Sequence, residues 1–218
     1  AFLARWGLTP EQENTLIDKI IAETVENLAQ DLMAPGGNNP LFGIDIQNSR
    51  DHEDPFGKAN ASRIVVGGTI DESGIPTIGI AQSIDVGNFA TQETGLVLLD
   101  LLSAPFGDPN SLNTFPREVN KVTIVAAGVG NIIAHEAGHI FGNFHTEQFV
   151  TLPNIMDQGG NLSNTIGIGE DEIFGTIDDV DVDFGKDTFV PNEGFLGTED
   201  TLNTVAFGLS TASGTVQY

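Results

Sequence analysis

The sequence predicts an α+β fold in which helices pack on a mixed β-sheet. Three observations lead to this class: an amphipathic helical segment near the N-terminus, strand-like segments after it, and a second helical segment near residue 135. A chain of 218 residues with 39% hydrophobic residues is long enough to bury a core of its own. We therefore expect residues 1–218 to form one domain with two lobes, 1–142 and 143–218.

The N-terminal helix is expected to begin at a capping box. Thr9 and Gln12 supply its two halves, and Pro10 occupies the first helical position, where proline is favoured. Apolar residues then recur at helical spacing up to a stop signal at Pro35-Gly36-Gly37. They are Leu16, Ile17, Ile20, Ile21, Val25, Leu28, Leu32 and Met33. This spacing predicts a long helix with one face on the core.

Strand-like segments follow this helix, separated by stretches of turn-forming residues. We expect strands at Leu41–Gln47, Arg63–Ile70 and Ile78–Asp85, and a buried strand at Val122–Ala126. The apolar run Gly95–Leu102 fits either a helix or a strand, because its length is compatible with both.

The last third of the chain is acidic and ends in a predicted helix. Residues 170–200 contain eleven acidic side chains and one basic side chain. Thr198, Glu199 and Asp200 can cap a final helix that extends to Ser210.

The charge and composition exclude several functions. A net charge of −23 argues against a nucleic-acid partner and against an anionic membrane surface, since both require basic patches. No apolar run approaches the roughly 20 residues that span a bilayer. The absence of cysteine excludes disulfides, thiolate zinc sites and a cysteine nucleophile.

Three of the four histidines lie in the segment HEAGHIFGNFH, residues 135–145. If Ile132–Phe141 is helical, His135 and His139 project from one face, so their ring nitrogens can share a metal ion. Glu136 lies one residue further round the helix. It is then close enough to contact a water on that metal without being a ligand.

A glycine is expected to turn the chain so that the last histidine of the segment reaches the same metal ion. Gly142 can adopt the left-handed conformation that ends a helix, and the turn lets His145 fold back as a third ligand. Three neutral imidazoles suit Zn²⁺ and leave a fourth position for water. The metal lowers the pKa of that water, and Glu136 can take its proton.

The segment matches HExxHxxGxxH, the signature of the metzincin clan of zinc peptidases, and the chain resembles that family. Metzincins also carry a methionine in a tight turn beneath the metal, which Met156 in the segment PNIMD fits. The resemblance implies that His135, His139 and His145 bind zinc. It also implies that Glu136 is the general base of an endopeptidase acting on proteins or peptides.

Other segments fit the metzincin order, which is a twisted mixed sheet with a backing helix and an active-site helix, then an irregular lobe ending in a helix. The long N-terminal helix resembles the backing helix, Val122–Ala126 the strand before the active-site helix, and Thr198–Ser210 the C-terminal helix. An antiparallel edge strand would line the cleft and pair with the substrate backbone. Its expected residues are Gly79, Ile80, Ala81, Gln82 and Ser83.

The chain departs from the better-known metzincins after the third histidine. Thr146-Glu147 is not the hallmark of matrixins, astacins, serralysins or adamalysins. His-Thr at this point and Asn-x-Met-Asp in the turn are loosely similar to pappalysin-like and reprolysin-like bacterial enzymes. The resemblance implies a monomeric bacterial enzyme, secreted or at the cell surface, with any targeting segment or pro-segment outside this chain.

The acidic segment Gly169–Asp183 predicts calcium binding. It places carboxylates at short intervals around a glycine turn, and calcium takes about six to eight oxygen ligands. The candidates are Asp171, Asp178, Asp179, Asp181 and Asp183, with Glu172 and Asp187 weaker. The alternative is a solvated acidic loop.

Two other functions remain open at this point. One is a non-catalytic, calcium-stabilised surface or adhesion module with structural zinc, in which Glu147 closes the metal shell. The other is a HExxH enzyme whose third ligand is a downstream glutamate such as Glu147 or Glu170. The spacing of His145 favours the histidine as the third ligand.

Overall fold

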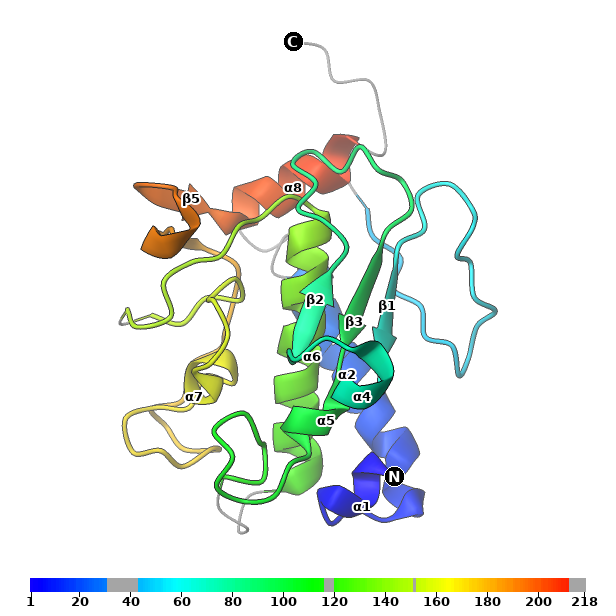
Figure 1. Cartoon of the computed structure of the whole chain (residues 1–218), viewed down its shortest axis with the longest axis vertical. Coiled ribbons are helices and arrows are strands. Elements are labelled where there is room, and N and C mark those ends of the chain that lie inside the picture. The colour runs from blue at the N-terminus through cyan, green and yellow to red at the C-terminus, as the bar shows by residue number, and fades with distance from the viewer. Residues whose placement is uncertain (31–42, 116–119, 151, 212–218) are drawn as a thin grey trace.

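The computed structural model describes residues 1–30, 43–115, 120–150 and 152–211. Its central element is helix α6, Lys121–Ile140. The sheet lies on one side of α6, and the loops of the C-terminal part lie on the other (Figure 1). The fold mixes helices and strands, as the sequence predicts.

The N-terminal helix packs along α6 and begins at the predicted capping box. The backbone N–H of Thr9 donates to Oε1 of Gln12 over 2.9 Å. The helical elements are α1 (Phe2–Arg5), η1 (Pro10–Gln12), α2 (Glu13–Val25) and the π-helical turn η2 (Glu26–Gln30). Leu16 of α2 is buried and belongs to the core cluster that α6 also joins. Leu32, Met33 and the stop at Pro35 lie outside the described residues.

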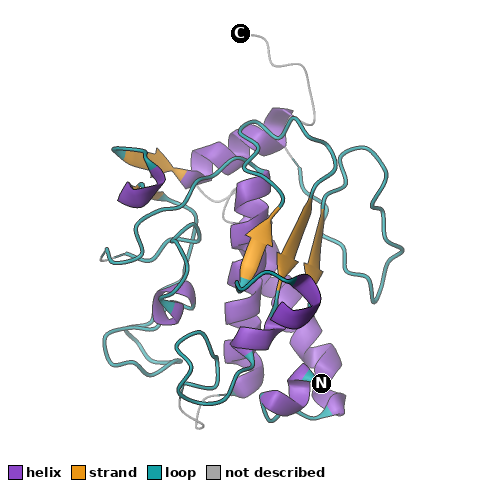
Figure 2. Cartoon of the chain, viewed as in Figure 1, coloured by secondary structure: helices purple, strands orange, loops and turns teal. Residues whose placement is uncertain are grey.

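The sheet is mixed, as predicted. In the described part of the chain its strands are β1 (Arg63–Val66), β3 (Thr94–Val97) and β2 (Gly79–Ala81), in that spatial order. β1 and β3 are parallel, whereas β2 is antiparallel to β3 and lies at the edge next to α6 (Figure 2). The mixed pairing therefore leaves an antiparallel edge strand beside the histidine-bearing helix.

Several predicted strands are shorter than expected or differ in type. Val122–Ala126 is not a strand but the start of α6, where the side chain of Asn120 accepts from the N–H of Val122. A short, mostly apolar run is compatible with either a buried strand or part of a buried helix, which explains the error. The ambiguous run Gly95–Leu102 divides into β3 and a helical turn, α5 (Leu99–Leu102).

Two of the remaining strand predictions were too long, since β1 ends at Val66 and β2 covers only Gly79–Ala81, and the third forms no strand over its described residues. Ile70 leaves β1 and begins α4 (Ile70–Ser73), because Thr69 caps that helical turn. The expected strand at Leu41–Gln47 has no ladder partner over Gly43–Gln47, although Ile44 and Ile46 alternate inward onto the core. Leu41 lies outside the described residues.

The C-terminal part consists of loops held by short elements and one helix. These are α7 (Leu162–Thr165), β4 (Lys186–Thr188), η3 (Pro191–Glu193), β5 (Thr198–Asp200) and α8 (Thr201–Thr211). β4 and β5 form an antiparallel hairpin, here called the C-terminal hairpin. Thr198–Asp200 was predicted as a helix cap but forms β5. Within it, only Asp200 caps α8, accepting from the N–H of Asn203 over 3.1 Å.

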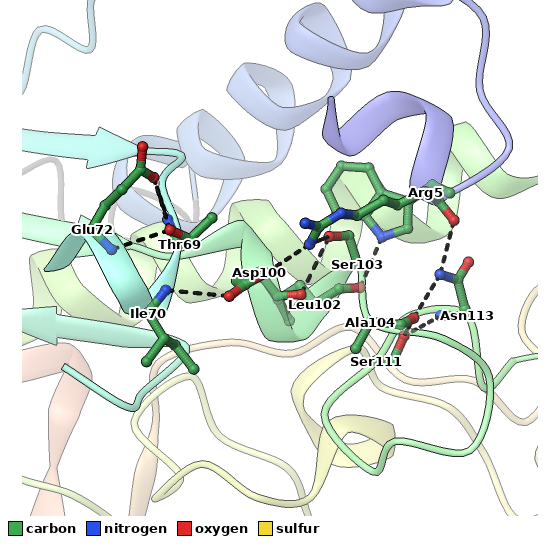
Figure 3. A network of polar contacts seen from close by, with 11 residues as sticks. Arg5, Thr69, Ile70, Glu72, Asp100, Leu102, Ser103, Ala104, Ser111 and Asn113 are labelled. Atoms are coloured by element: carbon green, nitrogen blue, oxygen red, sulfur yellow. Dashed lines mark hydrogen bonds and ion pairs between the residues drawn. The ribbon is translucent and has the colours of Figure 1, made fainter. Parts of the chain in front are cut away.

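A polar network anchors α5 to the N-terminus (Figure 3). Nη1 of Arg5 lies 2.6 Å from Oδ1 of Asp100, and Nε1 of Trp6 donates to the carbonyl of Leu102 over 2.8 Å. These contacts hold α5 against the core cluster of the sheet side, to which Leu102 belongs. Within the described ranges, no helix combines the length and apolarity needed to cross a membrane.

Candidate metal centre

Three histidine rings converge at the C-terminal end of α6. Nε2 of His139 lies 3.1 Å from Nε2 of His135 and 3.1 Å from Nε2 of His145. The three ligand atoms lie within 4.8 Å of one another, so the cluster could hold a metal ion. His135 and His139 come from one face of α6, and His145 comes from the turn that follows it.

Each ring is oriented by an oxygen at its other nitrogen. Nδ1 of His135 lies 2.7 Å from the carbonyl oxygen of Ile155, and Nδ1 of His139 lies 2.8 Å from that of Asn143. Nδ1 of His145 lies 2.5 Å from Oε1 of Glu193. Because these oxygens only accept, each Nδ1 must carry the proton and donate it. In a neutral ring, Nε2 is then left with a lone pair.

The donor set fits zinc on these grounds. Nε2 of His139 lies 3.1 Å from Nε2 of each of the other two rings, so their lone pairs repel one another, and a cation between them removes that repulsion. Zn–N bonds of about 2.0–2.1 Å in a tetrahedron place the nitrogens about 3.3 Å apart, close to what is observed. Burial lowers the pKa of His135 well below its usual value. Burial and His145 lower the pKa of His139 to about 4, so both rings stay neutral.

Gly142 makes the turn that brings His145 back. Its φ of +109° lies in the left-handed region that glycine favours, and its N–H donates to the carbonyl of His139 over 2.9 Å. A side chain here would also clash, because an added Cβ would lie 2.7 Å from Cα of Val86. The chain approaches this loop closely, since the N–H of Asp85 donates to the carbonyl of His139.

Glu136 lies beside the tripod, beneath the edge strand. The residue is 3% exposed, and burial raises the pKa of its carboxyl to about 8. A Cβ added at Gly79 would lie only 2.1 Å from Oε1 of Glu136, so the space for this carboxyl exists because residue 79 is glycine. A cation in the tripod would lower this pKa again, because opposite charge favours the carboxylate.

Met156 lies in a tight turn and packs against α6 at Gly138. It is fully buried, and a Cβ added at Gly138 of α6 would lie 2.4 Å from its Sδ. Oδ1 of Asn154 accepts from the N–H of Met156, and Oδ2 of Asp157 accepts from the N–H of Asn154. Oγ1 of Thr146 donates to Asp157, whose pKa burial raises to about 6. The turn is thus tied to the residue after the third histidine.

A cavity of about 610 Å³ opens between β2, α6 and the segment after Met156. Of the expected edge-strand residues, Gly79, Ile80, Ala81 and Ser83 line it. Gln82 does not: its backbone N–H donates to the carbonyl of Thr94, and its side-chain oxygen accepts from the N–H of Thr94. Gln82 therefore faces β3 rather than the cavity.

Glu193 is a site residue that the sequence did not reveal. It lies 48 positions from His145 and reaches it from the C-terminal hairpin. The hairpin is also joined to the turn through its backbone, because the N–H of Val190 donates to the carbonyl of His145. Glu199 accepts from the N–H of Phe144 over 3.1 Å. No spacing rule links these glutamates to the histidines, so only the fold could identify them.

Neither proposed glutamate ligand joins the tripod. Glu147 and Glu170 are both absent from the group of ligand atoms formed by the three histidines. The backbone N–H of Glu147 donates to the carbonyl of Thr188, and its Oε1 accepts from the N–H of Phe149 over 3.4 Å.

The predicted calcium ligands do not form one cluster. Asp178 and Asp179 accept hydrogen bonds from their own loop: Oδ2 of Asp178 from the N–H of Asp171, and Oδ1 of Asp179 from the N–H of Gly169. Asp171 accepts from the N–H of Ile173.

Asp181 and Asp183 instead lie close to a helical residue. They gather with Glu26 of η2, with ligand oxygens within 4.8 Å of one another. The weaker candidates Glu172 and Asp187 belong to neither group of possible ligands found in the described residues. The predicted loop site is thereby divided between two places.

Comparisons with protein-family models, with curated proteins and with solved structures found no match.

Proposed function

We propose that this chain is a zinc-dependent endopeptidase of the metzincin type. The observation that carries the proposal is the arrangement of three outward Nε2 lone pairs with the carboxyl of Glu136 beside them, on the wall of an open cavity. Zinc bound there would activate a water molecule and polarise the carbonyl of the cleaved bond. Structural zinc sites instead use four protein ligands and leave no open position.

Residues of the chain itself would transfer the proton, bind the substrate and support the histidines. Glu136 takes a proton from the attacking water and delivers it to the departing amine. The backbone of β2 has an edge that pairs with no other described strand, so an extended peptide can add to it as a further strand. Met156, packed against α6 at Gly138, would support the histidines from below.

The order of elements supports the metzincin assignment. A long helix, a mixed sheet with an antiparallel edge, a histidine-bearing helix, a methionine turn and a final helix follow one another. In this proposal β3 takes the place of the strand before the active-site helix, which Val122–Ala126 was expected to occupy. The same proposal makes the enzyme a monomer that acts on proteins or peptides outside a bacterial cell or at its surface.

The decisive variant is Glu136→Gln. We expect it to retain zinc in metal analysis and to lose cleavage of a denatured protein by about 10²–10⁴-fold, the usual effect of removing a general base. Glu147→Gln is the matched control, because it makes the same charge change two residues after His145, outside the tripod, and should keep both zinc and activity. The chelator 1,10-phenanthroline should inhibit the enzyme, and added zinc should restore it.

Two outcomes would contradict the proposal. A wild-type protein that holds zinc but cleaves no peptide would favour the non-catalytic surface module. Loss of zinc in Glu147→Gln would favour a glutamate as the third ligand.

A further inference from the structure

We propose that the substrate carries a basic side chain about three or four residues before the cleaved bond, held by Ser83 with the carboxyl of Glu93 behind it. This inference rests on the proposed endopeptidase function and names a substrate residue for the same cavity. Ser83 is exposed and lines the cavity, whereas Glu93 is only 1% exposed. We call these two residues the Ser83–Glu93 pair.

Both side chains of the pair lie on the face of the sheet that covers α6 (Figure 1). Side chains alternate along a strand, so Ser83 shares its face with Gly79, and Glu93 shares its face with Gly95. A Cβ added at Gly79 would lie 2.1 Å from Oε1 of Glu136, and one added at Gly95 would lie 3.5 Å from Cβ of Glu136. The pair is therefore on the same side of the sheet as the proposed base.

The hydrogen bond within the pair leaves Ser83 as an acceptor. Oγ of Ser83 donates to Oε1 of Glu93. A serine hydroxyl has one proton and two lone pairs, so this oxygen can only accept a further hydrogen bond. A substrate group that contacts it from the cavity must therefore be a donor.

The carboxyl of Glu93 has no cation beside it. In the described part of the chain its Oε2 is buried without a hydrogen bond, and none of the ion pairs includes Glu93. Burial raises the pKa of Glu93, and the charge of Asp85 adds to this effect. Arg63 of β1 is engaged elsewhere, with Asp54 and with the ring of Phe56. A cationic substrate group would therefore meet negative charge that nothing nearby offsets.

The position of Glu136 sets the direction of the peptide along β2. In hydrolysis the oxygen of water bonds to the carbonyl carbon, the C–N bond breaks, and the nitrogen leaves with a proton. Glu136 delivers that proton, so the departing nitrogen lies beside its carboxyl, under Gly79. The carbonyl lies toward the tripod. Beyond β2, the N–H of Asp85 donates to the carbonyl of His139, so the edge continues toward the tripod end of α6. Residues before the cleaved bond therefore follow the edge from Gly79 toward Ser83.

The spacing along the edge identifies the substrate residue. Ser83 follows Gly79 by four positions, and a peptide that pairs with this edge has nearly the same rise per residue. The N–H of Gln82 donates to the carbonyl of Thr94, so the backbone groups of the next residue, Ser83, point to the free edge. The substrate residue opposite Ser83 directs its side chain to the same face as the hydroxyl.

A basic side chain satisfies both requirements of the pair. Lysine and arginine side chains donate hydrogen bonds, accept none and carry positive charge. An ammonium bonded to Oγ of Ser83 lies about two hydrogen-bond lengths, roughly 5–6 Å, from the carboxylate of Glu93. Among the described residues that line the cavity, none is lysine or arginine, so no cation of the chain itself competes there. We therefore assign Ser83 as a specificity-determining residue and Glu93 as the residue that orients it.

The first test uses zinc-loaded enzyme at pH 8 and peptides that differ only at the third or fourth residue before the cleaved bond: Lys, Arg, norleucine or Glu. Mass spectrometry identifies the bond, and kcat/KM is measured for each peptide. We expect Lys and Arg to exceed norleucine by about tenfold at one of these positions, the lower end for a hydrogen bond to a charged group. Glu should be cleaved most slowly. Equal or better cleavage with norleucine or Glu at both positions would overturn the inference.

A control series separates the pair from the net charge of −23, which attracts any cationic peptide. The same residues are placed at the fourth position after the cleaved bond, away from Ser83. The preference for Lys over norleucine should be much smaller there. An equal preference at both places would assign it to the overall charge and would overturn the inference.

The second test changes the pair. Ser83→Ala removes the acceptor, and Glu93→Gln removes the charge but keeps an oxygen for the hydroxyl. Each should lower the Lys-to-norleucine ratio of kcat/KM by about tenfold, whereas a purely structural contact would affect all peptides alike. The matched controls are Ser163→Ala in α7, outside the cavity, and Glu53→Gln in the exposed loop before β1. Both should keep the ratio. If Glu93→Gln folds poorly by circular dichroism, Ser83→Ala decides, and an unchanged ratio there would refute the role of the pair.

A third measurement separates this inference from the proposed function. Binding of the same peptides to zinc-loaded Glu136→Gln is followed by fluorescence anisotropy, which needs no turnover. Lys and Arg peptides should bind most tightly, and adding Ser83→Ala should remove that preference. If the wild type cleaves peptides without a basic preference, the endopeptidase stands and this inference fails. If nothing is cleaved, the endopeptidase fails, and equal binding of Lys and norleucine peptides would also remove the subsite.

Discussion

Removing the carboxylate of Glu193 should weaken zinc binding without touching a metal ligand. The other two histidines donate from Nδ1 to backbone carbonyls, of Ile155 and Asn143, which no side-chain substitution removes. His145 alone is oriented by a side chain. Glu193 is therefore the one position where the effect of ring orientation on this tripod can be measured by mutation.

The expected loss of zinc affinity can be estimated from the contact between His145 and Glu193. Losing the partner of a metal-bound histidine costs about 10–100-fold in metal affinity. Both side chains are 25% exposed, so solvent screens part of the interaction and the lower end is expected. We expect Glu193→Ala to weaken zinc binding about tenfold, or about 1.4 kcal/mol. Glu193→Gln keeps an accepting oxygen but loses the charge. Since charge-assisted bonds are roughly twice as strong, it should cost about threefold.

The assay is competition for zinc against a chromophoric chelator at pH 7.5. Glu53→Gln, at an exposed glutamate in the loop before β1, makes the same charge change and should bind zinc as the wild type does. If Glu193→Ala binds zinc with unchanged affinity, the ring of His145 is oriented by its backbone alone. An equal loss in Glu53→Gln would instead point to the overall charge of the protein.

Three further predictions concern the glycine beside Glu136, the pH dependence of stability and the removal of calcium. Gly79→Ala should lower peptidase activity while zinc is retained in metal analysis, because its Cβ would displace the carboxyl of Glu136; unchanged activity would show that this carboxyl can move freely. Burial raises the pKa of Glu199 from 4.5 to about 7, so its protonated form is favoured in the folded protein. The stability this gives is present below about pH 4.5 and is lost as the pH rises through about 7. The wild type should therefore lose roughly 1–3 kcal/mol relative to Glu199→Gln between pH 4.5 and 8 in urea unfolding, and parallel pH curves would contradict the assignment. Removing calcium should lower the melting temperature far more than an equal change in ionic strength, and equal effects would leave the acidic segment as a solvated loop.

Local sequence signals predicted local structure well. Thr9 and Gln12 form their capping box, and the spacing of His135 and His139 places both rings on one face of α6. These signals work because the interacting residues lie within one or two helical turns, where backbone geometry alone sets their distance. Gly142 belongs to the same group, since a positive φ is a property of a single residue.

Sequence signals failed where contacts with residues distant in the sequence determine the secondary structure or the grouping of side chains. Val122–Ala126 is short and buried except at Thr123, and it carries no periodicity that separates strand from helix. The acidic segment was expected to gather one set of carboxylates. Instead, Asp178 and Asp179 accept hydrogen bonds from backbone N–H groups of their own loop, whereas Asp181 lies close to Glu26 of η2. The composition gives the number of carboxylates, whereas the fold determines which of them lie close together.

Three glycines position parts of this site, and the sequence revealed the structural role of only one of them, Gly142. A Cβ at Gly79 would reach Oε1 of Glu136, one at Gly138 would reach Sδ of Met156, and one at Gly142 would reach the backbone of Val86, all within 2.7 Å. The carboxyl of Glu136, the side chain of Met156 and the loop after the edge strand are thus each placed by the absence of a side chain. A glycine has no functional group that would mark it as part of a site, and Gly79 lies far from the histidines in the sequence. Ligands are recognisable in a sequence because their chemistry is specific, whereas the close approaches that position them become visible only once the chain is folded.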